Sequence, residues 1–150
     1  MKKIMIFLLC CLLFNLASCS SALKHKDVDS WLISKAGSEK ATVNVTGSWE
    51  DIYRDKKSYH QFHPWAGYTG WDRGTFEQRG SEVTGTLGNY MIKGIVSGDT
   101  LVMVIMYGGT PYYMAKLKMR NNRLSGEYYY SKDKELESPF SMTLKKVESQ

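Results

Sequence analysis

The stretch from Tyr90 to Tyr130 constrains the fold more than any other part of the chain. It consists of short apolar segments separated by pairs of turn-forming residues, Gly98-Asp99, Gly108-Gly109 and Asn121-Asn122. Such pairs adopt positive φ angles at little cost, as two-residue β-hairpin turns require. Successive strands joined by tight turns form an antiparallel meander. This stretch therefore predicts a sheet built from neighbouring hairpins.

Similar segments continue the pattern on both sides. The predicted strands are Val43–Tyr53, Gly74–Gln78, Glu82–Leu87, Tyr90–Ser97, Thr100–Tyr107, Pro111–Met119, Arg123–Ser131 and Pro139–Lys146. A meander of many short strands avoids exposed sheet edges when its first and last strands pair. We therefore predict an all-β fold over residues 42–150: a single antiparallel up-and-down meander barrel of about eight strands.

Turn length predicts which side chains face the barrel interior, because residues that flank a two-residue turn pair across it on one face. The inward pairs predicted in this way are Phe76–Gly85, Gln78–Val83, Leu87–Tyr90, Gly85–Ile92, Val96–Leu101, Gly94–Met103, Met119–Leu124, Leu117–Gly126 and Ala115–Tyr128. Nearly all of these residues are apolar, small or aromatic, so one face of the sheet is consistent with a core.

The pattern breaks at Gly108-Gly109. A two-residue turn there would place Lys116 inside the barrel, together with Tyr112 and Met114. We therefore predict a three-residue Gly108-Gly109-Thr110 loop with a β-bulge, since a bulge shifts the facing of the strand by one residue. This choice turns Tyr113, Ala115, Leu117 and Met119 inward.

Residues 1–18 have the pattern of a secretory signal peptide. Two lysines precede an apolar run, Ile4 to Leu16, that is too short to span a bilayer comfortably. The run ends in Leu16-Ala17-Ser18-Cys19, which resembles the lipobox of bacterial lipoproteins. The resemblance implies that Cys19 is lipidated and anchors the mature protein in a membrane. Ser20 in the following position implies the outer membrane, facing the periplasm; an ordinary signal peptide with a free Cys19 is the alternative.

Residues 19–41 are polar and mixed, and we interpret them as a tether that joins the barrel at the end opposite its mouth. Asp29-Ser30 is expected to cap a short helix over Trp31, Leu32 and Ile33. The predicted strand Thr100–Tyr107 is apolar on both faces, so its outer face needs a cover. The tether, through Trp31 and Ile33, is one candidate cover, and a docked partner protein is the other.

A weak repeat marks the inner face of the predicted sheet. Its three copies are Val45-Thr46-Gly47-Ser48-Trp49, Val83-Thr84-Gly85-Thr86-Leu87 and Leu124-Ser125-Gly126-Glu127-Tyr128. Glycine inside a strand marks close packing or tight curvature. Across residues 43 to 147 this pattern resembles the streptavidin-like and lipocalin-like small barrels. The resemblance implies architecture only, and the ligands of those families do not transfer with it.

One end of the predicted barrel, which we call the mouth, gathers aromatic residues. The predicted facing brings Tyr90, Tyr107, Tyr113 and Tyr130 to its rim, and the long loop 54–73 adds Tyr59, Trp65, Tyr68 and Trp71. These eight residues are the candidate ligand-binding set, for a small apolar ligand or a protein partner. The loop is either a lid over a pocket or a plug whose rings complete the core.

Catalytic and metal chemistry find little support in the sequence. His60 and His63 are the only candidate metal pair, and a stable site needs more ligands than two, so no metal or cofactor is predicted. No nucleophile elbow or phosphate-binding glycine loop occurs. Asp51 falls on the inward face near the mouth, whereas the neighbouring Glu50 faces outward. Without Lys2 and Lys3 the formal net charge falls from +5 to +3, and its even spread argues against nucleic-acid binding.

The sequence thus predicts a non-enzymatic, lipid-anchored cell-envelope protein whose barrel binds a small apolar ligand or a protein partner at its aromatic end. One alternative is a structural accessory subunit of an envelope complex. Another is an inhibitor of the periplasmic lysozyme type, some of which are small lipid-anchored barrels. The internal disulfide found in several of those is impossible here, because Cys10, Cys11 and Cys19 all precede the barrel.

Overall fold

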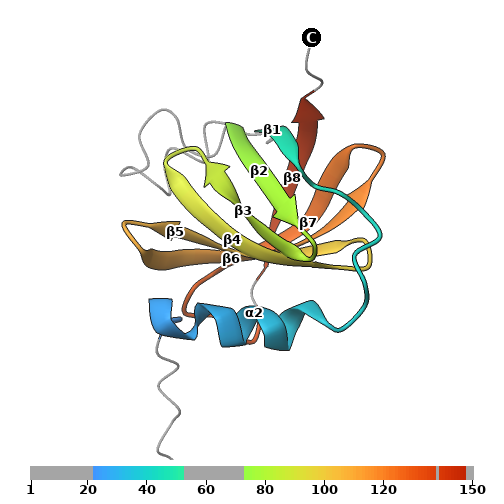
Figure 1. Ribbon diagram of the computed structural model, residues 1–150. Coiled ribbons are helices and arrows are strands. Elements are labelled where there is room, and N and C mark those ends of the chain that lie inside the picture. Colours follow the sequence, from blue (N-terminus) through green and yellow to red (C-terminus); the bar gives the residue numbers. More distant parts are fainter. Residues whose placement is uncertain (1–21, 53–72, 138, 148–150) are drawn as a thin grey trace, which may run out of the picture.

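The computed structural model describes residues 22–52, 73–137 and 139–147. Its elements are the 3-10 turn η1 (His25–Asp27), the helix α2 (Val28–Ala36) and the strands β1 (Gly47–Asp51), β2 (Arg73–Arg79), β3 (Glu82–Leu87), β4 (Tyr90–Ser97), β5 (Thr100–Tyr107), β6 (Thr110–Arg120), β7 (Arg123–Tyr130) and β8 (Phe140–Val147). Each strand pairs antiparallel with the next, and β8 returns to β1. The predicted closed, eight-stranded, up-and-down barrel is confirmed (Figure 1).

Cross-strand register follows the predicted inward pairs. Phe76 lies opposite Gly85, Leu87 opposite Tyr90, and Leu117 opposite Gly126. The other six predicted pairs are also present. The first strand is shorter than predicted, because residues 43–46 precede the sheet and fold across one end of the barrel.

The length predicted for the loop at Gly108 is wrong, but the predicted inward facing of Tyr113 is correct. Tyr107 pairs with Thr110, so Gly108-Gly109 is a two-residue turn with positive φ at both glycines. The register shifts just beyond it: Met106 lies opposite Pro111 and Ile105 opposite Tyr113. The extra residue in β6 is therefore Tyr112. This bulge turns Tyr113 inward, as predicted, and leaves Tyr112 exposed at the rim.

The barrel interior is filled by apolar side chains. The fully buried ones include Trp49, Phe76, Leu87, Leu101, Met103, Ile105, Leu117, Leu124 and Leu144. Inner glycines make room for them: a Cβ on Gly126 would collide with the backbone oxygen of Lys116. Such glycines permit the tight curvature of a small barrel.

The end of the barrel opposite the mouth, which we call the base, is sealed by the segment before β1. The Gln78 side chain accepts a hydrogen bond of 2.8 Å from the Val45 amide and donates one of 3.1 Å to the Val43 carbonyl. Thr42 is bonded to Gly98 at the β4–β5 turn, with its amide donating over 2.8 Å. The tether therefore joins the barrel at the base, as predicted.

Helix α2 covers the outer wall over β4 and β5 (Figure 1). Trp31 and Leu32 are buried there with Val102, Val104, Met106, Met114 and Tyr129. Lys93 on β4 and Asp29 on the helix form an ion pair of 2.6 Å. The expected cover by the tether is confirmed for Trp31 and wrong for Ile33, which is 68% exposed. The expected cap is also wrong, because the helix begins at Val28, ahead of Asp29-Ser30.

The helix runs from the mouth towards the base, so the beginning of the tether lies at the mouth (Figure 1). The Leu23 amide donates a hydrogen bond of 2.8 Å to the carbonyl of Ser131, which directly follows β7. Residues 22–36 are thus packed on the outside of the barrel through Leu23, Val28, Trp31 and Leu32.

Candidate functional site

The mouth carries a continuous series of aromatic rings across five strands. Tyr90 begins β4 and Tyr107 ends β5, and their ring centroids lie 5.8 Å apart. Tyr113 contacts Tyr90 at 6.1 Å and Tyr130 at 5.6 Å. The structure therefore brings together all four rim tyrosines that the sequence predicts. These distances are typical of tilted and edge-to-face aromatic pairs, which are favourable beyond the area they bury.

Three further rings belong to this series and were not predicted as site residues. Tyr112 contacts Tyr90 and Tyr107, each at 6.5 Å. Tyr128 and Phe140 stack at 5.2 Å and extend the series to β8. Tyr128 carried a signal, since its predicted pairing with Ala115 placed it inward. Tyr112 was considered only for a two-residue turn at Gly108-Gly109, which was rejected because it would also turn Lys116 inward. The bulge in β6 brings Tyr112 to the rim without that consequence.

The rings divide into a buried layer and an exposed layer. Tyr90 and Tyr113 are almost completely buried, whereas Tyr107 is 56%, Phe140 43% and Tyr112 39% exposed. The exposed rings rest on the buried ones, so their positions are fixed by packing. Asp51 ends β1 on the inward face, opposite Leu144, as its position in the sequence predicts. The mouth can therefore offer apolar ring faces and phenol groups to another molecule.

Several predicted site residues lie outside the described residues. These are Cys19, Tyr59, Trp65, Tyr68 and Trp71, together with the histidines His60 and His63. Within residues 22–52, 73–137 and 139–147, no group of three potential metal ligands is found. No helix in the same ranges is long and apolar enough to cross a bilayer.

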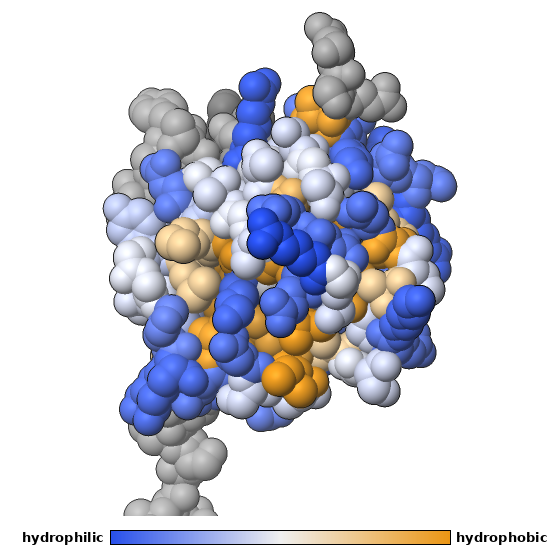
Figure 2. Space-filling model, in the orientation of Figure 1, coloured by the Kyte–Doolittle hydropathy of each residue, from blue (hydrophilic) through white to orange (hydrophobic). Residues whose placement is uncertain are grey.

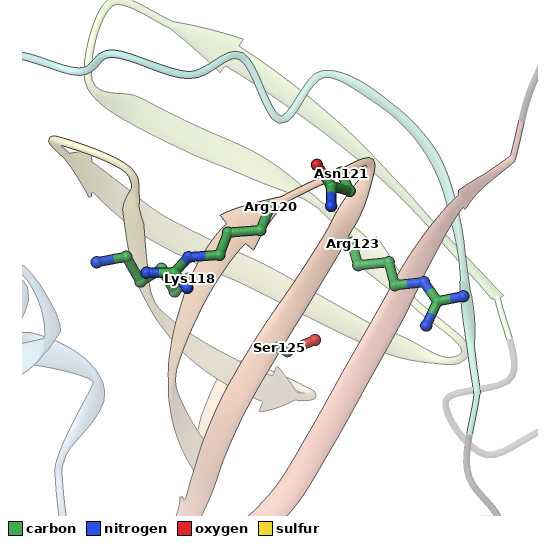
Figure 3. A pocket seen from close by; sticks show the side chains of 5 residues that line it. All are labelled: Lys118, Arg120, Asn121, Arg123 and Ser125. Atoms are coloured by element: carbon green, nitrogen blue, oxygen red, sulfur yellow. The ribbon is translucent and has the colours of Figure 1, made fainter.

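A second candidate site is a hollow at the base, on the outside of the β6–β7 hairpin. Its lining residues are Lys118, Arg120, Asn121, Arg123 and Ser125, and it encloses about 670 Å³ (Figure 3). The side chain of Arg120 extends towards Lys118, whereas that of Arg123 points towards β8. Asn121 lies in the β6–β7 turn and adopts a positive φ of 48°. The hollow is open to solvent and carries three cations, so it can attract anions but cannot surround them.

Register aligns several charges around this hollow. Arg120 lies opposite Arg123, and Arg123 lies opposite Lys145. Lys145 in turn faces Glu50 on β1. Lys118 forms an ion pair of 3.2 Å with Asp99. Desolvation by itself would raise the pKa of Asp99, but the contacts with Lys118 and Thr100 together outweigh it, so the pKa is lowered. Arg123 is thus flanked by a cation on each side, and like charges directly opposite each other are destabilising.

One tyrosine has a strongly shifted pKa, and it lies under the helix, on the outer face of β7. Burial, followed by a 2.6 Å hydrogen bond from its hydroxyl to Glu127, raises the pKa of Tyr129 to about 12. Tyr129 is buried in the cluster that also holds Trp31 and Leu32. Its role is therefore to pack and orient the helix on the outer wall.

Comparison with known proteins returns no match: no family model, no curated protein and no solved structure is significantly similar to this chain.

Proposed function

We propose that this protein is a lipid-anchored, non-enzymatic component of a bacterial cell envelope that binds another molecule through the aromatic rim of its barrel. The observation that carries the proposal is the layered mouth, in which the exposed rings Tyr107, Tyr112 and Phe140 rest on buried ones. Rigid, half-exposed aromatic side chains bind partners at low entropic cost, because they have few rotatable bonds to immobilise.

Filling of the interior favours binding at the rim over binding deep inside. Ile105 and Leu87 are fully buried just below the mouth, and Trp49 and Phe76 fill the barrel beneath them. An eight-stranded barrel is narrow enough for side chains to fill it, so a deep calyx is not needed to explain the fold. The rim therefore suits an apolar or ring-bearing group presented by a small molecule, a protein or a lipid surface.

The anchor rests on Leu16-Ala17-Ser18-Cys19. Acyl chains on Cys19 would hold the protein stably at a membrane, because each buried CH2 contributes about 0.8 kcal/mol. Ser20 favours the outer membrane with the barrel in the periplasm. An inhibitor of lipoprotein signal peptidase should cause a larger precursor to accumulate, and Cys19→Ser should prevent acyl labelling. An unchanged mass with the inhibitor would refute the anchor.

The alternative function, a structural accessory subunit, was favoured by the apolar outer face of β5, and this face is covered in the structure. Val102, Val104 and Met106 would form an exposed apolar strip for a docked protein, but all three are buried beneath helix α2. The outer wall over β4 and β5 is therefore already occupied by the chain itself.

Site-specific photo-crosslinking in intact cells tests the rim directly. A photoreactive amino acid at position 107 should form adducts that mass spectrometry can identify, whether they are protein, lipid or small molecule. The matched control is position 33, which is more exposed and lies on the helix, outside the mouth. Equal adduct yields at positions 107 and 33, or none at 107, would contradict binding at the rim.

A further inference from the structure

The beginning of the described chain is fixed to the aromatic rim by two consecutive backbone hydrogen bonds. Leu23 donates to the carbonyl of Ser131 over 2.8 Å, and Ser131 donates to the carbonyl of Tyr112 over 2.9 Å. Leu23 is itself buried with Val28 and Trp31 in the cluster beneath α2. The chain therefore leaves the barrel beside an exposed ring of the mouth.

The distance from this point to the anchor is short. Cys19 precedes Leu23 by four residues, and an extended chain spans at most about 3.5 Å per residue, so Cys19 can lie no farther than about 14 Å from Leu23. The strands are longer than this: β5 has eight residues and extends over roughly 26 Å at about 3.3 Å per residue. A lipid attached at Cys19 thus brings the mouth, rather than the base, next to the bilayer.

The side chains at the mouth suit a membrane interface. Tyr107 and Tyr112 flank the tip of the β5–β6 hairpin, and Phe140 is exposed at the start of β8. Tyrosine is enriched at the boundary between lipid and water because its ring is apolar and its hydroxyl is polar. At the left of Figure 2, where the β5–β6 hairpin ends, the described surface is largely pale to tan, whereas blue and orange residues alternate over the wall beside it.

We infer that the aromatic rim binds the lipid surface itself, so that the barrel stands mouth-down on the membrane with Tyr107, Tyr112 and Phe140 in the interface. The inference rests on the proposed lipid anchor and names the bilayer as the partner of the proposed rim site. Covalent attachment makes the contact intramolecular, so even weakly favourable rings stay engaged at the high effective concentration that a short linker provides. The base, where Arg120 and Arg123 flank the β6–β7 turn, then faces away from the membrane.

Fluorescence quenching on the full lipidated protein in pure lipid vesicles tests this orientation. The native cysteines are at positions 10, 11 and 19, so an introduced cysteine is the only free thiol of the processed, lipidated protein. Thr110→Cys places a dye on the rim between Tyr107 and Tyr112, and Ser81→Cys places it in the β2–β3 turn at the base. Both positions are exposed. Lipids carrying a quencher near the headgroup should quench the dye at 110 and leave the dye at 81 unchanged.

The same probe separates the contribution of the rings from that of the anchor. Tyr107→Ser combined with Tyr112→Ser should reduce quenching at position 110 while flotation with the vesicles persists; unchanged quenching would refute insertion of these rings. Unquenched dye at both positions on floating vesicles would overturn the lipid contact and leave the anchor standing. Quenching of the dye at position 81 alone would show the opposite orientation, with the base on the membrane. Failure to float, with no acyl group on Cys19, would overturn the anchor and the inference together.

A purely proteinaceous partner gives a different result. Quenching at position 110 would then be absent in lipid vesicles, and the photo-crosslinker at position 107 would yield a protein adduct in cells. That combination would support the rim as a binding site and refute the bilayer as its occupant.

Discussion

The indole nitrogen of Trp31 donates a hydrogen bond of 3.3 Å to the carbonyl oxygen of Lys134, which lies on the loop between β7 and β8. This contact joins the helix to a segment 103 residues away in sequence. Lys35 and Glu135, which form an ion pair of 3.0 Å, reinforce it one turn further along. The helix is therefore fastened both to the wall of the barrel and to the loop beside the mouth.

Trp31→Ala should loosen this attachment. Removing a buried tryptophan leaves a cavity against Val102 and Val104, and we expect the free energy of unfolding to fall by about 3 kcal/mol. The matched control is Ile33→Ala on the exposed side of the same helix, which should change it by less than about 0.5 kcal/mol. Chemical denaturation measures both. Similar losses for the two variants would contradict the orientation of the helix.

Gly126→Ala should destabilise the barrel by crowding. The added methyl group would collide with the Lys116 carbonyl oxygen and approach the Leu117 Cα at 3.1 Å, and neither backbone atom can move without disturbing the β6–β7 pairing. We expect a loss of about 3 kcal/mol in the free energy of unfolding, at the upper end for overpacked cores. The exposed neighbour variant Ser125→Ala is the control, and thermal unfolding that ranks the two variants equally would refute the crowding.

Arg123→Thr should stabilise the protein, because it removes a cation that lies between Arg120 and Lys145. Relief of one cross-strand repulsion is expected to raise the free energy of unfolding by about 0.5 kcal/mol at low ionic strength. The gain should shrink as salt is added, since exposed charges are screened. Arg79→Thr removes an arginine that instead pairs with Glu77 at 2.7 Å, and it should give no such gain. Stabilisation that is independent of salt would argue against an electrostatic cause.

Tyr129 predicts a specific loss of stability at high pH. Its pKa is raised in the folded protein, so the folded state holds the phenol proton more tightly than the unfolded state does. Stability from this group is therefore complete below pH 10, the ordinary pKa of tyrosine, and is lost as the pH rises through about 12. Denaturation at a series of pH values should show a smaller decline between pH 10 and 12 in Tyr129→Phe than in the unmodified protein. An equal decline in both would assign the loss to other groups.

Much of the barrel is predictable because its turns are short. Gly98-Asp99 and Asn121-Asn122 fix the register of their hairpins, and a fixed register decides which side chains face inward. The length of the Gly108 turn was not predicted correctly in this way. Moving the bulge from the turn into β6 preserves the facing of Tyr113, so facing alone cannot locate it, and Tyr112 was missed as a rim residue.

The placement of the helix was less accessible from the sequence. The apolar outer face of β5 indicates that something covers it, and the tether offered Trp31 and two adjacent aliphatic residues. Which of them faces the barrel depends on how the helix is rotated, and Leu32 rather than Ile33 is buried. Its direction depends on contacts between residues distant in sequence, such as Leu23 with Ser131. Local patterns carry no information about such contacts, so the proximity of the tether's start to the mouth emerges only from the fold.

Because β1 pairs with β8, the first strand of the barrel cannot complete its pairing before the last strand is present. Trp49 lies opposite Lys146, and Asp51 opposite Leu144, so the cylinder cannot close until nearly the whole chain is available. Contacts so distant in sequence slow folding, because a long loop must be ordered before they form. A chain with this topology stays open until its last strand has been synthesised. The barrel closes when β8 pairs with both β7 and β1.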